Sequence, residues 1–153
     1  MDKLEQVKAI CQENSKVEAL VLPFDFASSP PAAWKKLASV LNELDISVLV
    51  NNAAVSHDFP VSFLDEGDNS CLIVVTRNDL DPKRTEMIMA VNTDAVMKMT
   101  AIVLPQLVSK KHGLVLNIGS MLGKLPSALL SVYSGSKAFL RHWSICTIFL
   151  STF

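Results

Sequence analysis

The sequence is poor in cysteine and in blocks of one charge. Its three cysteines, Cys11, Cys71 and Cys146, are odd in number and widely spaced, which argues against a disulfide framework or a zinc site and favours a reducing compartment. The 14 basic and 15 acidic side chains give a formal net charge of -1, with no basic block. The chain lacks the electrostatic footprint of a nucleic-acid-binding protein, so we expect no nucleic-acid partner. The scattered cysteines likewise lead us to expect no metal.

Long apolar runs are also missing, although apolar residues are abundant. No run approaches the ~20 residues that a membrane-spanning helix needs, and Met1-Asp2-Lys3 is charged where a signal peptide would be apolar. We therefore expect no targeting or transmembrane segment in the chain as given. Hydrophobic residues make up 50% of the 153, with a mean hydropathy of +0.33. These values suit one domain with parallel strands buried on both faces.

The spacing of apolar residues alternates between helical and strand-like patterns, which predicts an α/β domain. Helices are expected over residues 2–13, 32–44, 85–111 and from 133 onward. Strands are expected over residues 17–22, 46–50 and 114–118. The serines of Ser28-Ser29-Pro30-Pro31 are expected to cap the second helix. Pro105 is expected to bend or shorten the long helix.

Three polar residues are expected to lie close together: a tyrosine and a lysine at the start of a predicted helix, and a serine after the end of a predicted strand. If Tyr133 opens a helix, Lys137 lies one turn on, on the same face, and Ser120 follows the strand 114–118. An ordinary tyrosine has a pKa of about 10, but a fixed cation favours the phenolate and brings proton transfer near neutral pH within reach. A nearby serine could hydrogen-bond the substrate oxygen. The set predicts carbonyl reduction; the plain alternative is a tyrosine–lysine pair that only covers a helix face.

Together with Asn51-Asn52-Ala53-Ala54 after the strand 46–50, these residues resemble the short-chain dehydrogenase/reductase family. The resemblance runs over about residues 1–144. It implies that four residues are catalytic, namely Asn92, Ser120, Tyr133 and Lys137. In that assignment Asn92 supports a water in the proton relay to the lysine. The other interpretation of Asn92 is an ordinary polar helix residue.

The same resemblance implies a nicotinamide cofactor, NADPH or NADH. The residues it places at the cofactor are Asp25, Asn52, Ala53, Tyr133 and Lys137. Asp25 would hydrogen-bond the adenine amino group; its alternative is a turn or helix-cap acid. The family has glycine where this sequence has Ala54, a mild change. His57 is expected to be a loop residue without a direct role, because it has no partner at metal-ligand spacing.

Two parts of the family's fold have no counterpart in the sequence. The family begins with a strand and a glycine-rich turn whose amides bind pyrophosphate, whereas none of the five glycines here forms a spaced cluster between a strand and a helix. The expected fold is a partial Rossmann-like doubly wound parallel sheet that lacks the first two strands and the C-terminal strands. The missing pair would stand between the strands 17–22 and 46–50. Either these two strands pair directly, or the chain is a piece of a larger enzyme.

The whole of residues 1–153 is expected to be one partial domain with two departures from the family. Residues 65–84 are an atypical insertion, either an extra hairpin or sequence foreign to the fold, and residues 145–153 are a divergent tail. The loop 120–132 is apolar, which suits either a lipid-like substrate or packing under the neighbouring helix.

In three runs, the sequence most resembles two groups within the family: the 3-oxoacyl-CoA reductases of fatty-acid elongation and the related hydroxysteroid dehydrogenases. These runs are residues 49–52, 56–60 and 126–140. The likeness implies NADPH-dependent reduction of an acyl-CoA at the endoplasmic reticulum membrane, and a homo-oligomer through residues 85–111 and 133–150. The alternatives are a non-catalytic fragment or oligomerisation module, and a reductase of a steroid or small ketone.

Overall fold

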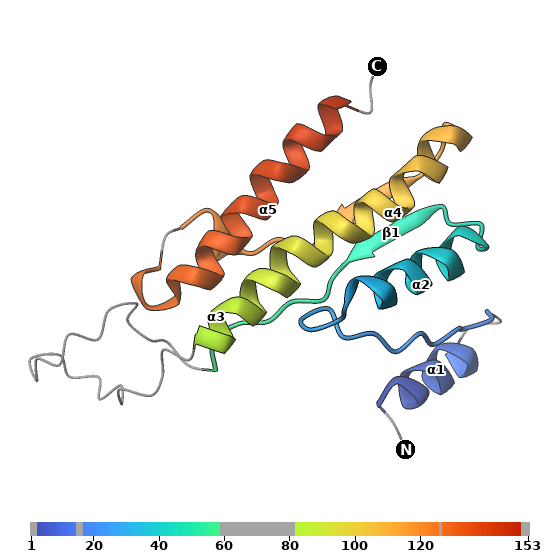
Figure 1. Cartoon of the computed structure of the whole chain (residues 1–153), viewed down its shortest axis with the longest axis horizontal. Helices are drawn as coiled ribbons and strands as arrows, with labels where there is room; N and C mark the ends of the chain where they lie inside the picture. Colours follow the sequence, from blue (N-terminus) through green and yellow to red (C-terminus); the bar gives the residue numbers. More distant parts are fainter. Residues whose placement is uncertain (1–2, 15–16, 59–81, 126, 151–153) are drawn as a thin grey trace, which may run out of the picture.

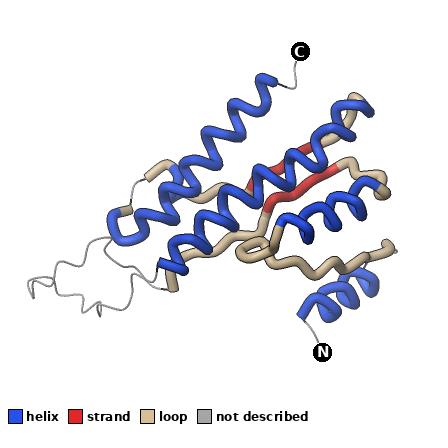
Figure 2. The backbone as a smooth tube through the Cα atoms, in the orientation of Figure 1, coloured by secondary structure: helices blue, strands red, loops and turns tan. Residues whose placement is uncertain are grey.

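The computed structural model describes residues 3–14, 17–58, 82–125 and 127–150. In this part of the chain, two parallel strands lie under a layer of helices (Figures 1 and 2). Most of the insertion 65–84 and the end of the tail 145–153 lie outside the described residues. Residues 82–84 of the insertion begin a helix. The α/β class is confirmed.

The two strands are β1 (Val48–Asn51) and β2 (Leu114–Asn117), which pair in register with Val48 opposite Leu114. Each strand follows a helix, as an α/β crossover requires. Both are shorter than the apolar runs that predict them. Their carboxyl ends meet at one edge, where Asn51 lies opposite Asn117, and this edge carries the candidate residues.

The long helix consists of α3 (Pro82–Met89), a π-helical turn (Ala90–Asp94) and α4 (Ala95–Lys110). A π-turn inserts one extra residue into a helix and is frequent at functional sites. The helix ends at Lys110, and Lys111, which has a left-handed backbone, caps it. Pro105 lies inside α4 without ending it.

The core lies between α4 and one face of the strands. Leu49, Val103 and Leu107 are buried there, and Met99 and Val115 pack against them. Helices α2 (Pro31–Asn42) and α5 (Ser131–Leu150) flank this helix, α2 against α4 and α5 against α3 and the π-turn (Figure 1). Leu49 and Val115 lie opposite each other on one face of the strands, and α4 covers this face.

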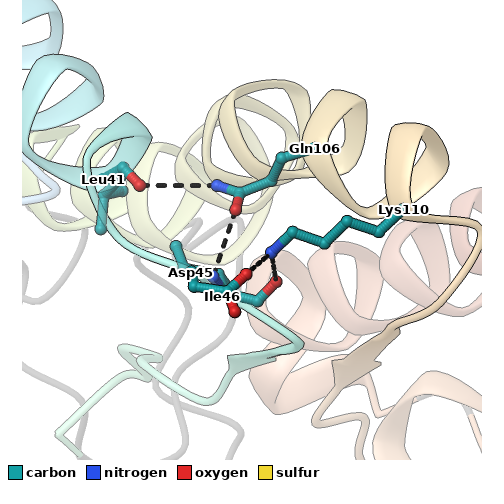
Figure 3. A network of polar contacts seen from close by, with 5 residues as sticks. All are labelled: Leu41, Asp45, Ile46, Gln106 and Lys110. Carbon is teal, nitrogen blue, oxygen red and sulfur yellow. Dashed lines mark hydrogen bonds and ion pairs between the residues drawn. The ribbon is translucent and has the colours of Figure 1, made fainter.

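The connection from α2 to β1 is fixed to the end of α4 (Figure 3). The Gln106 side chain accepts a hydrogen bond from Ile46 N–H at 3.2 Å and donates one to the Leu41 carbonyl at 3.4 Å. Lys110 forms an ion pair with Asp45 and donates to the Ile46 carbonyl at 3.1 Å. These contacts set the start of β1 relative to the helix that covers it.

The strand predicted over Val17–Leu22 is wrong. Residues 17–25 are extended chain without strand pairing, and Val17, Leu20 and Leu22 are exposed. A strand exists only through hydrogen bonds to a neighbour, and β1 pairs with β2 alone in the described part of the chain. Direct pairing of the two predicted strands is therefore not observed.

The N-terminal helix and the start of α2 correct two further details. Helix α1 (Lys3–Asn14) forms as expected, beside the extended segment (Figure 1). Helix α2 begins at Pro31, with Pro30 rather than a serine at its cap and no side-chain hydrogen bond there. Proline at the first helical position needs no N–H partner, so the predicted serine cap is not used.

The second face of the sheet is exposed. Val48, Val50, Leu114, Leu116 and Ile118 all project from it, at 38% to 54% exposure. The helix from Pro82 to Lys110 is long and apolar enough to cross a membrane by length and composition alone. A core helix passes the same test, and this one packs on both strands.

Candidate active site

The first turns of α5 carry Tyr133 and Lys137. The helix begins at Ser131, two residues earlier than the sequence predicts. Lys137 Nζ lies 5.8 Å from the centroid of the Tyr133 ring. The four-residue spacing therefore places the ammonium beside the phenol ring, as expected for residues one helical turn apart.

The Lys137 side chain reaches inward from α5 to the end of β2. The residue is 3% exposed, and its Nζ donates a hydrogen bond to the Ile118 carbonyl at 2.9 Å. Burial lowers the pKa of this ammonium below its usual value. The bond joins α5 to the residue that stands two positions before Ser120.

Ser120 is the first residue of a short turn that packs on α5. It caps the 3-10 helix η2 (Met121–Gly123), and its Oγ accepts the Leu122 N–H at 3.2 Å. Within the described part of the chain, no acceptor of the Ser120 hydroxyl hydrogen is found. The turn is held to α5 because Ser134 Oγ donates to the Leu122 carbonyl, and because Gly123 approaches Lys137 so closely that a Cβ there would lie 2.8 Å from the lysine carbonyl oxygen.

Asn92 stands in the π-turn and is fully buried. Its side-chain amide forms two hydrogen bonds with the backbone of Val55, accepting the N–H and donating to the carbonyl, both at 2.8 Å. Its Nδ2 also donates to Ser136 Oγ at 3.0 Å. Ser136 Oγ in turn donates to the Tyr133 carbonyl at 2.7 Å. The loop after β1 is thus connected through one asparagine to the helix of the tyrosine.

Ser134 and Ser136 are residues that sequence reasoning misses. Both are buried and polar, and both bond to another element or residue of the site. Their only signal in the sequence is their position between Tyr133 and Lys137. A buried hydroxyl needs partners, and those partners are visible only in three dimensions.

A second network of side chains holds the carboxyl ends of the strands together. Asn51 Nδ2 donates to Asn117 Oδ1 at 2.8 Å and to Thr100 Oγ1 at 3.2 Å. Asn117 Nδ2 donates to Ser144 Oγ at 2.9 Å. The two strands, α4 and α5 are therefore joined directly beneath the candidate residues.

Asn52 and Ala53 lie in the loop that follows β1, and both are exposed. The Asn52 N–H donates to the Val50 carbonyl at 3.1 Å. With the buried Lys137 ammonium, this open loop suits the ribose end of a nicotinamide dinucleotide. The sequence offers no glycine-rich turn for the pyrophosphate, so the residues fit one part of such a cofactor.

Asp25 lies in an exposed turn before α2, and its hydrogen bonds are local. Its carboxylate accepts from the Ser28 hydroxyl and from the Ala27 N–H, the latter at 2.8 Å. These bonds, the one from Ser28 first, lower the pKa of the carboxyl. The geometry fits the turn-acid alternative, and the described contacts do not join Asp25 to the other candidates. Its role toward adenine stays a prediction.

His57 is a loop residue held against α3. Its Nε2 is buried and has no hydrogen-bond partner among the described residues. Desolvation lowers the pKa of its imidazole, with Arg84 acting in the same direction and Asp58 against it. Arg84 Nη2 and Asp58 Oδ1 form an ion pair at 2.6 Å. Within the described ranges, no three histidine, cysteine or acidic side chains gather as a metal site.

The model of the short chain dehydrogenase family matches residues 1–147 of this chain. Among its relatives, a very-long-chain 3-oxoacyl-CoA reductase of Podospora anserina is 38% identical over 130 residues, covering 85% of this chain and 34% of the relative. A protein of the same name from Yarrowia lipolytica is 34% identical, covering 93% of this chain and 36% of the relative. The chain thus spans about a third of the length of these relatives.

Solved structures of short-chain dehydrogenases share the fold. One from Sphingobium yanoikuyae in complex with NADPH has a TM-score of 0.72 and 25% identity. The match covers 97% of this chain and 52% of the Sphingobium chain. A 3-oxoacyl (acyl-carrier-protein) reductase from Agrobacterium tumefaciens has a TM-score of 0.66 at 22% identity. Since the family model spans nearly the whole sequence and the α/β arrangement agrees with it, the chain belongs to the short-chain dehydrogenase family.

Proposed function

We propose that this chain supplies the catalytic part of an NADPH-dependent reductase that converts a 3-oxoacyl-CoA to the 3-hydroxyacyl-CoA in fatty-acid elongation. The observation that carries the proposal is the position of the Lys137 ammonium, 5.8 Å from the Tyr133 ring and bonded to the end of β2. Ser120 begins the next turn. The names of the relatives support the substrate class.

Tyr133, Ser120 and Lys137 have different chemical tasks in this proposal. A bound nicotinamide supplies the hydride. Tyr133 donates its phenolic proton to the substrate carbonyl oxygen, and Ser120 donates a hydrogen bond to the same oxygen. Lys137 favours the negative charge that forms on the phenol oxygen and contacts the cofactor ribose. Asn92 fixes the loop after β1 to α5, which keeps the donors in place.

The apolar loop after Ser120 supports a lipid-like substrate. Met121 is 67% exposed and Leu125 59% exposed, although both side chains are apolar. Packing against α5 partly buries Leu122 but leaves these two side chains in water. An acyl chain lying over the loop would remove this surface from water, which is worth about 25 cal/mol per Å².

The proposed enzyme acts at the endoplasmic reticulum membrane as a homo-oligomer. Apolar side chains on the long helix and α5 support association with a second copy, because Met89, Val108, Phe139 and Ile145 are each at least 39% exposed. Sedimentation of the longest gene product in detergent measures this, and a monomer at micromolar concentration would contradict it.

The substrate class is tested by following NADPH oxidation by the longest protein that the gene encodes. Long-chain 3-oxoacyl-CoA, a 17-ketosteroid and a small ketone are compared as substrates. The proposal expects kcat/KM for the acyl-CoA to exceed the other two by at least about a hundredfold, which corresponds to about 2.7 kcal/mol. A preference for the steroid would replace the acyl-CoA assignment but keep the reductase chemistry.

The alternative, a non-catalytic fragment, is tested on the 153-residue chain itself. NADPH is titrated against the purified chain by calorimetry. Micromolar binding would show that the chain holds the cofactor without a glycine-rich turn and would contradict the fragment interpretation. Absence of binding, together with a folded chain by circular dichroism, would support it, because the pyrophosphate then lacks its usual backbone amides.

A further inference from the structure

A groove of about 390 Å³ lies between α2 and α4, a volume in the range of small-molecule sites. Its walls come from these two helices and from the turn before α2. Neither α5 nor the loop after β1 contributes a lining residue, so the groove is separate from the candidate active site. Ala38 and Ala101 line it from opposite helices, and their small side chains leave the space open.

The floor of the groove is apolar and fixed in place. Trp34 is buried at 9% exposure, and its ring lies 4.8 Å from Phe24, edge to face, and 5.9 Å from Phe26. Such a three-ring cluster holds the indole in one orientation. With Ile102, the indole offers a preformed surface for an alkyl or aromatic group.

The rim of the groove is positively charged. Lys98 Nζ stands 5.0 Å above the Trp34 ring and forms an ion pair with Asp94 at 2.6 Å, so its charge is largely matched. Lys35 also lines the groove but has no ion pair or hydrogen bond within the described part of the chain. It lies one turn from the start of α2, where no acidic residue offsets the helix dipole. Among the described residues, the Lys35 ammonium thus remains without an anionic partner.

We propose that this groove binds a small amphipathic carboxylate, with its alkyl body on the Trp34 indole and its anionic group at Lys35 near the start of α2. The apolar floor accounts for the body, and the unmatched positive charge on the rim accounts for the head. The site goes beyond the reductase function proposed above and uses none of its catalytic residues, although it shares the long helix with the proposed interface between copies. Its test therefore needs no turnover.

The probe is octanoate, titrated below its micellar concentration into the 153-residue chain. A Trp143→Phe background leaves Trp34 as the fluorophore, because the sequence has two tryptophans. The proposal expects a saturable change in Trp34 emission with octanoate and a weaker response to octanol and to octylammonium. Equal binding of all three would overturn it, since only the carboxylate matches the charge on the rim.

Two variants and one control separate a specific site from general apolar binding. Lys35→Gln is expected to weaken octanoate binding roughly threefold to fivefold, the effect of one exposed ion pair. Ala101→Phe is expected to abolish binding by filling the groove, and its exposed position on α4 tolerates the change. Lys36→Gln, also exposed on α2 but outside the lining, is expected to leave affinity unchanged. Equal affinities in all three variants would also overturn the proposal.

Discussion

At the scale of single residues, Lys137 shows how a charged group is kept in a buried position. The residue is 3% exposed, and a cation removed from water is costly unless it has partners. The Ile118 carbonyl is one such partner, at 2.9 Å. Burial lowers the pKa of Lys137 below its usual value. A position that is expensive to maintain favours a functional role over a structural one.

Ser136 is expected to be more important for stability than its small size suggests. Ser136→Ala removes the acceptor of Asn92 Nδ2 and the donor to the Tyr133 carbonyl, so we expect a loss of about 1–3 kcal/mol in the free energy of unfolding. Urea denaturation of Ser136→Ala, Asn92→Leu and the double variant measures it. Because the two side chains share a bond, their effects should be non-additive by at least about 0.5 kcal/mol. Simple additivity would contradict the network.

The positions of residues were predictable where sequence spacing determines them and were not predictable where they depend on the folded chain. Tyr133 and Lys137 lie four apart, and helical geometry alone brings them together. Asn92 lies in the π-turn and contacts Val55 from there. The apolar periodicity of the sequence does not predict this π-turn. For Asp25, the sequence left a turn acid and a cofactor residue as alternatives. The structure shows local hydrogen bonds from Ser28 and Ala27 to its carboxylate, as a turn acid would form.

At the scale of elements, the contact of η2 with α5 is expected to depend on the absence of a side chain at Gly123. A Cβ in Gly123→Ala would lie 2.8 Å from backbone atoms of Lys137, and backbone cannot rotate away. We expect a loss of about 1–3 kcal/mol in unfolding free energy, measured by urea denaturation.

The matched control for this substitution is Gly135→Ala, on α5, the helix that Gly123 contacts. An added Cβ at Gly135 meets nothing within 4 Å, so alanine should stabilise α5 by about 0.5–1 kcal/mol through its higher helix propensity. Opposite signs for the two variants are expected. A neutral Gly123→Ala would show that η2 and α5 do not pack as closely as described.

The loop after β1 is expected to give the chain an acid-sensitive stability through His57. The pKa of this imidazole is lowered from its ordinary value of 6.5 by burial and by Arg84, so the unfolded state binds the proton more readily. The contribution of His57 is complete above about pH 6.5 and is lost as pH falls through the lowered value.

The measurement is the unfolding free energy from about pH 7 to pH 5 for the natural chain and for His57→Gln. The natural chain should lose stability more steeply on acidification, because glutamine has no proton to take up. Parallel curves for the two proteins would contradict the lowered pKa. Other titrating groups cancel, since both proteins share them.

Elements were predictable from apolar pattern where a partner element exists. The runs 46–50 and 114–118 became β1 and β2 because each has the other as its neighbour and α4 as its cover. The run 17–22 has the same apolar character but no strand beside it, and so remains extended. An apolar run indicates that a segment can form a strand, but whether it does depends on a neighbouring strand elsewhere in the chain.

At the scale of the whole molecule, the sheet has one covered and one exposed face. Leu49 faces α4 at 9% exposure, whereas Leu116 on the other face is 45% exposed. We expect Leu49→Ala to cost about 2–5 kcal/mol in unfolding free energy and Leu116→Ala to cost less than about 1 kcal/mol. Thermal denaturation of the two variants measures the difference. Equal losses would mean that both faces are covered in solution.

Single-turnover reduction of a 3-oxoacyl-CoA by the longest gene product, with and without Tyr133→Phe, tests most directly whether Tyr133 is the proton donor. The substitution removes only the hydroxyl that would donate the proton. The reduction rate is expected to fall by about 10²–10⁴-fold, while the Kd for NADPH, measured on the same two proteins, stays within about twofold. A Tyr133→Phe protein that reduces the substrate at the natural rate would contradict the account.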